Sequence, residues 1–337
     1  MENDFFIILL FIALNLIFIL YFEDIKFFHI NIDKPDSKRK LHKKPVPLAG
    51  GTIIFINLIF YSLSIFFNEK LFLNEILFKN QFNFILFFLS CFAIFILGFL
   101  DDKLNISAAI KFFIITLLII LILFLDEKLI LDKIKFSFFD SIFYLSEFSI
   151  IFTCFCFLVY LNAFNMFDGI NLQSCSYSTI IFMCILIFYL DIILIKILLI
   201  SLVSYGYLNF KNKSFLGDSG SLLLAFIVSY VFIKLYNLNI INFSDEVVIF
   251  MLIPGIDLIR LFFMRVLKKK NPLSPDRLHL HHLLLLKFSY KSTLTIIILL
   301  ISAPIILNFL KVDILYTIIL TIFIYSFLIT SIKRKKL

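Results

Sequence analysis

The stretch AIKFFIITLLIILILFL, from Ala109 to Leu125, decides the fold class of this protein. It is 17 residues long and, apart from Lys111 and Thr116, entirely apolar. A helix crosses the hydrocarbon of a bilayer in about 20 residues, and about 17 are enough. The stretch lacks the polar–apolar alternation of a barrel strand, and a helix satisfies its own backbone hydrogen bonds in lipid. It therefore predicts a transmembrane helix.

The same pattern repeats along the whole chain, which has 337 residues of which 62% are hydrophobic. This composition predicts an all-α, polytopic integral membrane protein with about eleven transmembrane helices and a single membrane-embedded domain over residues 1–337. The boundary at Asp191 rests on one acidic residue, because the spans on either side of it can also be read as one long helix. The expected spans are 5–22, 46–67, 82–100, 109–125, 148–164, 175–190, 192–210, 219–236, 247–264, 293–310 and 314–331.

Lysine and arginine are distributed unevenly between the two sides that these spans create. If the N-terminus lies outside, the cytoplasmic connections and C-terminus carry 21 Lys and Arg residues and the opposite side carries 6. Cytoplasmic loops are enriched in these residues, so the count predicts an external N-terminus and a cytoplasmic C-terminus. The same rule accounts for the net charge of +8 without a nucleic-acid partner.

The polar motifs of the chain fall in the cytoplasmic connections, and the external connections offer nothing comparable. The expected active-site loops lie near residues 23–45, 101–111, 162–174, 211–221 and 265–292. They include, in this order, the motifs RKLHKKPVPLAGG, GFLDDKLNISAAIKF, NAFNMFDG, FLGDSGS and SPDRLHLHH, some of which begin or end in the adjoining spans.

These loops combine the residue types that phosphoryl transfer requires. Carboxylates that can hold Mg²⁺ together with substrate oxygens are Asp101, Asp102, Asp168 and Asp218. The glycines of LGDSG and PLAGG would let the backbone approach an anion, and the N-terminus of a following helix favours phosphate. Countercharge comes from Lys43, Lys44, Lys111, Arg277 and the histidines. Positioning and charge neutralisation dominate such chemistry, so we expect a soluble polyphosphate to be joined to a lipid.

Each motif also has a structural interpretation when it is taken alone. Adjacent acids such as Asp101 and Asp102 can complement a helix dipole. GDSG is a common turn, and His281 and His282 can be interfacial residues or ligands of nickel or zinc. The functional interpretation rests on the gathering of all five motifs at one membrane face.

In order and position, the five motifs resemble those of the polyprenyl-phosphate N-acetylhexosamine-1-phosphate transferases. The similarity runs from about Asp33 to His282. It implies a bacterial cytoplasmic (inner) membrane enzyme that moves a sugar 1-phosphate from a UDP-sugar, expected to be a UDP-N-acetylhexosamine, to undecaprenyl phosphate and releases UMP. This reaction would be the first membrane step of a cell-envelope polysaccharide such as O-antigen or teichoic-acid linkage. The lipid I-forming phospho-MurNAc-pentapeptide transferase is the alternative within the same superfamily.

The resemblance also implies roles for individual residues. The catalytic residues would be Asp101, Asp102 and Asp168, and the ligands of Mg²⁺, or of Mn²⁺ in its place, would be Asp218 and Asp168. Substrate binding is expected from Lys44, Lys111, Asn162, Asn165, Asn171, Phe215, Arg277, His279, His281 and His282. Phe215 is expected to stack on uracil, and the histidines, with either charge state near pH 7, to receive pyrophosphate. Direct attack by the lipid phosphate is favoured over an aspartyl-phosphate intermediate, and a homodimer is compatible with this scheme.

The third motif departs from the family pattern Asp-Gly-x-Asp-Gly-Leu. Here Asn171 replaces the second acid and Leu172 replaces the second glycine. The change puts base contacts or donor choice in question and leaves an inactive paralogue as an alternative. A different class, a membrane transporter, would place charged residues within the spans, and the candidates there are Lys196, Lys234, Asp257 and Arg260.

Overall fold

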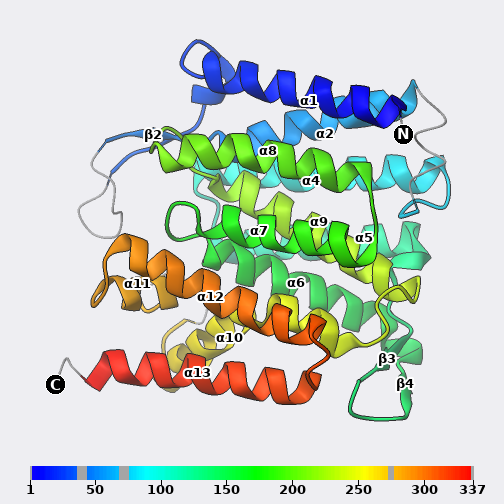
Figure 1. The fold of residues 1–337 in the computed structure, drawn as a ribbon, viewed down its shortest axis with the longest axis vertical. Coiled ribbons are helices and arrows are strands. Elements are labelled where there is room, and N and C mark those ends of the chain that lie inside the picture. The colour runs from blue at the N-terminus through cyan, green and yellow to red at the C-terminus, as the bar shows by residue number, and fades with distance from the viewer. Residues whose placement is uncertain (1, 36–43, 68–75, 272–276, 335–337) are drawn as a thin grey trace. The chain divides into compact units, whose positions relative to one another are not determined.

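The computed structural model describes residues 2–35, 44–67, 76–271 and 277–334, and these are mostly helical (Figure 1). The helices of the first part are α1 (Glu2–Leu20), α2 (Gly50–Phe66), α4 (Gln81–Leu104), α5 (Ala108–Leu125), α6 (Ser149–Phe167), α7 (Gln173–Cys184) and α8 (Ile193–Phe210). They are followed by α9 (Gly217–Asn237), α10 (Ser244–Leu267), α11 (Leu280–Leu285), α12 (Tyr290–Phe309) and α13 (Ile314–Arg334). Short strands pair as β1 (Ile32–Asp33) with β2 (Val46–Pro47), and β3 (Lys133–Lys135) with β4 (Ile142–Tyr144).

Within the described residues, eight helices are long and apolar enough to cross a membrane. Three shorter apolar helices, at Asp4–Leu20, Gly50–Phe66 and Gln173–Tyr189, coincide with three of the expected spans. The last of these ends in a π-helical turn at Tyr189, and α8 starts at Ile193, so the chain does break beside Asp191. The prediction of a mostly helical, multi-pass membrane protein is confirmed in this form, while the count of eleven and the orientation stay predictions.

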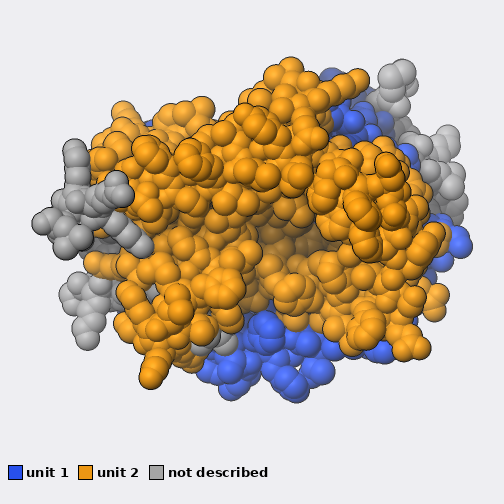
Figure 2. Space-filling model, turned by 90° about the horizontal axis from the view of Figure 1, so that it is seen from below, with its two compact units in different colours: residues 1–126, 174–228 blue, residues 127–173, 229–337 orange. Residues whose placement is uncertain are grey.

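The chain divides into two compact units, and each contains part of the predicted site. Unit 1 comprises Met1–Asp126 and Ser174–Val228, and unit 2 comprises Glu127–Gln173 and Ser229–Leu337 (Figure 2). In unit 1, α1 and α2 pack on α8, and α4 packs on α2 and α5. The buried side-chain amides of Asn15 and Asn57 join α1 to α2. Asn15 Nδ2 donates a hydrogen bond to Asn57 Oδ1 at 2.7 Å. Such pairs hold helices together where lipid gives no hydrophobic drive.

The glycines of PLAGG serve the packing of unit 1. The backbone N–H groups of Gly50 and Gly51 donate to the carbonyl oxygens of Phe215 and Leu216, at 3.0 Å each. A Cβ atom at Gly51 would lie 2.3 Å from the backbone nitrogen of Gly220 in α9, so only glycine allows this approach. The expectation that these glycines face an anion is therefore wrong, because α9 and the loop before it occupy that space.

In unit 2, α10 is the central helix. It packs on α6, α12 and α13, while α11 packs on α12 and α13 (Figure 1). The small β3–β4 sheet is antiparallel and was not predicted; Lys133 pairs with Tyr144 and Lys135 with Ile142. Side chains of the neighbouring helices hold it: Asp245 accepts from the backbone N–H of Ser137 at 3.1 Å.

Candidate functional site

Three predicted site residues of unit 1 form a charged cluster. The Lys111 Nζ atom donates to Asp101 Oδ2 and to Asp218 Oδ2, each at 2.6 Å. Asp101 stands in the last turn of α4, Lys111 in the first turn of α5 and Asp218 in the first turn of α9. Side-chain exposures are 7% for Asp101, 16% for Lys111 and 34% for Asp218, so the cluster opens to solvent on the Asp218 side.

Asp102 has a separate role from its neighbour. Its carboxylate accepts the backbone N–H of Asp218 at 2.7 Å and that of Ser219 at 3.1 Å. These are N–H groups of the first turn of a helix, which have no intrahelical partner and attract negative charge. The helix N-terminus at GDSG therefore binds Asp102, and the expectation that it receives a substrate phosphate is wrong at these two groups.

The other predicted residues of unit 1 that the structure describes, Phe215 and Lys44, lie in loops. Phe215 is half-buried, and its backbone N–H donates to the Pro47 carbonyl oxygen at 2.9 Å. Lys44 is exposed just before β2. Lys43 lies outside the described residues, as do Ser274, Pro275 and Asp276 of the histidine motif. Uracil stacking by Phe215 stays a prediction.

In unit 2, the histidine motif meets the NAFNMFDG motif. A Cβ atom at Gly169 would lie 2.0 Å from His281 Nε2, so the imidazole rests directly against the backbone beside Asp168. The ring of His281 is stacked 5.6 Å from that of His279 and lies 4.3 Å from that of His282. Burial and the neighbouring imidazoles hold the pKa of His281 well below its ordinary value. This ring is therefore neutral at pH 7, in contrast to the expectation of either charge state.

A buried carboxylate that was not among the predicted site residues anchors the histidine loop. Asp257 on α10 accepts from His279 Nδ1 at 3.1 Å and from the backbone N–H of Leu280 at 3.2 Å. Arg260 Nη2 donates to Asp257 at 2.8 Å and to the Leu278 carbonyl oxygen at 2.6 Å. The sequence offered a signal, since the spacing of Asp257 and Arg260 puts them one helical turn apart, before the histidine motif.

The other predicted residues of unit 2 surround the end of α6. Asp168 terminates this helix, and Asn162, one turn and a half earlier, donates to the Leu158 carbonyl oxygen at 2.7 Å. The Asn171 carbonyl oxygen accepts from the Tyr290 hydroxyl. Asn165 is half-buried on α6, and Arg277 is exposed at the start of the described histidine loop. The contacts of these residues with substrates stay predictions.

The described side chains can be assessed as ligands for the metal ions that the sequence suggested. Within the described ranges no group of three or more His, Cys, Asp or Glu side chains is arranged to hold a metal, which gives no support to a nickel or zinc site at the histidines. Mg²⁺ needs less, because it takes one or two carboxylates and completes its shell with water and substrate oxygens. Asp218 and Asp101, which share one lysine, fit that requirement.

Comparison with known proteins shows which family the chain resembles. The glycosyl transferase family 4 model matches residues 84–236, a segment with the Asp101–Asp102, Asp168 and Asp218 motifs. The undecaprenyl-phosphate alpha-N-acetylglucosaminyl 1-phosphate transferases of Salmonella typhi and Yersinia pestis are similar at 26% and 27% identity over 267 residues. A probable undecaprenyl-phosphate N-acetylglucosaminyl 1-phosphate transferase of Bacillus subtilis is 29% identical over 262 residues. Each similarity covers 75% of this chain and 69% of the relative. Over the segment that carries the Asp motifs, the chain is therefore similar to glycosyl transferase family 4.

The third motif, which departs from the family pattern, also has an unusual backbone conformation. Leu172 has φ of +64°, in the left-handed region, at the position where the family pattern described above has glycine. This conformation costs an L-residue roughly 1–2 kcal/mol, which glycine avoids. The backbone at this position therefore has a conformation that glycine adopts more readily than leucine.

We expect Leu172→Gly to be more stable than Leu172→Ala by about 1 kcal/mol, because both lose the same side chain and only alanine keeps the left-handed strain. Thermal unfolding of the two variants in detergent measures the difference. An alanine variant at least as stable as the glycine variant would show that Leu172 does not hold this conformation in solution.

The charged residues that favoured a transporter have partners in the structure. Asp257 and Arg260 anchor the histidine loop, as described above, and Lys196 pairs with Asp191 at 2.6 Å. The Lys234 ammonium lies 5.4 Å from the centre of the Tyr230 ring. Their placement inside helices is accounted for by these contacts.

Proposed function

We propose that the protein transfers N-acetylhexosamine 1-phosphate from a UDP-sugar to undecaprenyl phosphate and releases UMP. The names of the relatives indicate the acceptor and the sugar 1-phosphate. The observation that carries the proposal is the cluster of Asp101, Lys111 and Asp218, which joins three helix ends of unit 1 at 2.6 Å. A lysine between carboxylates provides both a cation site and a charge for phosphate oxygens.

In this proposal, Asp218 and Asp101 hold Mg²⁺, with Mn²⁺ as a substitute, while the role of Asp168 stays a prediction from the resemblance. The metal, when bound, would neutralise charge on the pyrophosphate. Lys111 fixes the orientation of both carboxylates. Its ammonium can also pair with a phosphate oxygen on which negative charge develops during transfer. Hydrogen bonds to the pyrophosphate of the UDP-sugar come from His279, His281, His282 and Arg277. A neutral His281 can take part, because a neutral imidazole keeps one N–H group.

Direct transfer accords with the partners of the two adjacent acids. Asp101 is engaged by Lys111, and Asp102 by two backbone N–H groups of α9, so neither carboxylate is presented as a free nucleophile. We propose that an oxygen of the lipid phosphate forms the new bond to the β-phosphorus of the donor. The bond from that phosphorus to the bridging oxygen breaks, and UMP leaves with the electron pair. A phosphate monoester is largely dianionic at pH 7, so this attack needs little help from a base.

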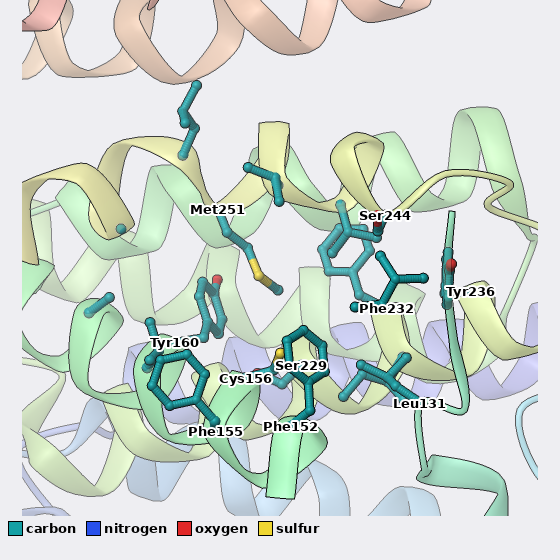
Figure 3. Close-up of a pocket in the computed structure, with 18 of the residues that line it drawn as sticks. Leu131, Phe152, Phe155, Cys156, Tyr160, Ser229, Phe232, Tyr236, Ser244 and Met251 are labelled. Atoms are coloured by element: carbon teal, nitrogen blue, oxygen red, sulfur yellow. The ribbon is translucent and has the colours of Figure 1, made fainter. Parts of the chain in front are cut away.

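A cavity in unit 2 offers an apolar site for the acceptor. It measures about 400 Å³ and lies between α6 and α10, with β3 at one end (Figure 3). Its lining includes Phe152, Phe155, Cys156, Phe232 and Met251, and Figure 3 shows Met251 projecting into it from α10. Pockets of this size and apolar character hold ligands of several hundred daltons. We propose that isoprene units of undecaprenyl phosphate occupy it.

Filling this cavity should weaken acceptor binding selectively. Gly255 lines it, and a Cβ atom there would meet no atom within 4 Å, so a larger side chain enters the cavity without a backbone clash. We expect Gly255→Leu to raise the KM for undecaprenyl phosphate about tenfold, which corresponds to about 1.4 kcal/mol, and to leave the KM for the UDP-sugar unchanged. Initial-rate kinetics of purified protein measure both constants.

Gly255→Ala is the matched control, because one methyl group leaves most of the cavity open. An unchanged acceptor KM in the leucine variant would place the lipid elsewhere. A matching rise in the donor KM would instead indicate a general distortion of α10.

The finer localisation is part of the same proposal. We propose that the protein lies in the bacterial inner membrane with the motifs at the cytoplasmic face, since the Lys and Arg count favours this orientation. Protease digestion of right-side-out and inverted membrane vesicles tests it: a tag at the C-terminus should be removed only from inverted vesicles. Removal of the tag from right-side-out vesicles would show that the C-terminus lies outside, which contradicts the proposed orientation.

Donor choice tests the proposed function. Purified protein is supplied with undecaprenyl phosphate, Mg²⁺ and either UDP-GlcNAc or UDP-MurNAc-pentapeptide. We expect a lipid-linked sugar and an equal amount of UMP with UDP-GlcNAc alone. Product only with the pentapeptide donor would favour the lipid I-forming alternative, and no product with any UDP-sugar would favour an inactive paralogue.

A further inference from the structure

The last helix of the chain contacts the anchor of the histidine loop through one phenol. Tyr325 lies in the middle of α13, and only 1% of its side chain is exposed. Its hydroxyl donates to Asp257 Oδ1 and accepts from Arg260 Nε at 2.8 Å. All three residues belong to unit 2. The hydroxyl is therefore used both as donor and as acceptor by an ion pair that is largely buried.

That ion pair in turn fixes three consecutive residues of the histidine motif. Arg260 donates to the Leu278 carbonyl oxygen, while Asp257 accepts from the His279 ring and from the Leu280 backbone N–H. A hydrogen bond at Nδ1 sets the orientation of an imidazole and the protonation of its other nitrogen, Nε2. Tyr325 reaches His279 only through these partners.

A phenylalanine at this position would keep the ring and remove the two hydrogen bonds. Arg260 Nε and one Asp257 oxygen would then lose a partner in a buried setting, which loosens the pair without leaving a cavity. Groups that act on a reacting phosphate must be held to within about half an ångström, so a small displacement of His279 is enough to slow the reaction.

We infer that Tyr325 is a positioning residue for His279, acting through Asp257 and Arg260, and that α13 is thereby part of the donor-binding machinery. This role rests on the proposed function for its kinetic consequence. The phenol itself does not touch substrate. The inference extends the functional part of the chain beyond the histidine motif to α13.

Kinetics of Tyr325→Phe test this role. We expect kcat to fall by about 10- to 100-fold, as for other small displacements of reacting groups, with the KM for undecaprenyl phosphate unchanged. In a His279→Ala background the same substitution should have no further effect, because the group that it positions is absent. A merely structural role would instead give two losses that multiply. Tyr316→Phe is the control: it lies on the same helix with 59% of its side chain exposed, and it should retain full activity.

A second measurement does not depend on transferase activity. The backbone N–H of Leu280 donates a hydrogen bond to Asp257. Its hydrogen exchange should be faster in Tyr325→Phe than in the wild-type protein or in Tyr316→Phe. Equal exchange in all three proteins, or a kinetic loss that persists undiminished in the His279→Ala background, would overturn the inference. Faster exchange in a protein without transferase activity would uphold the anchor and refute only the proposed function.

Discussion

Asp218→Asn is expected to reduce turnover by about 10³-fold, the upper end of what removal of one preorganised polar group costs an enzyme. The amide keeps the shape of the side chain but loses its charge. Lys111 then retains only Asp101 as a charged partner, and the proposed Mg²⁺ site loses its most exposed carboxylate. Initial rates across a Mg²⁺ titration measure both effects, and the variant should require more metal for its residual activity.

Asp191→Asn is the matched control for this substitution. Asp191 also pairs with a lysine at 2.6 Å, but 71% of its side chain is exposed, so the loss of its charge should be nearly neutral. Near-normal turnover of Asp218→Asn with an unchanged metal requirement would show that Asp218 is not a ligand of the metal.

Gly169→Ala is expected to lower activity by at least about 10²-fold, because it displaces a group next to the proposed reaction. The added Cβ atom would lie 2.0 Å from Nε2 and 2.1 Å from Cε1 of His281. The imidazole has little room to retreat, since it is 2% exposed and packed against two other imidazoles. Either the ring or the turn after Asp168 must therefore move. Turnover of the purified variant is the measurement.

Two further variants separate this local clash from a general effect of alanine. Gly255→Ala is also a glycine-to-alanine change in unit 2, but its Cβ atom would meet no atom within 4 Å, so activity should be retained. His281→Ala should lose a similar factor of about 10² or more if the ring stabilises developing charge, and adding Gly169→Ala to it should cost little more. Full activity of the single Gly169→Ala variant would contradict the contact.

The sequence was sufficient for features that depend on local pattern. The apolar stretches located the helices. Consecutive helical residues point about 100° apart, which explains why Asp101 and Asp102 have different partners. The resemblance of five motifs agrees with the match of the family model over residues 84–236.

The sequence was insufficient where a role depends on which helices approach one another. Asp102 caps α9 because α4 ends beside the first turn of that helix, and no pattern in the sequence indicates that contact. Gly51 was assigned to anion binding, although its lack of a side chain admits α9. Tyr325 gave no signal, since one tyrosine in an apolar span resembles an interfacial aromatic residue until its partners are known.

Exchange of label between UMP and the UDP-sugar measures most directly whether the chain moves a sugar 1-phosphate between UMP and a lipid phosphate. Purified protein is incubated with unlabelled UDP-GlcNAc, undecaprenyl phosphate, Mg²⁺ and radiolabelled UMP. We predict that label enters UDP-GlcNAc only when the lipid is present, because direct transfer needs both substrates bound, and that Asp218→Asn abolishes the exchange. Label entering UDP-GlcNAc without the lipid would establish a covalent enzyme intermediate, and no exchange under any of these conditions would contradict the transferase function.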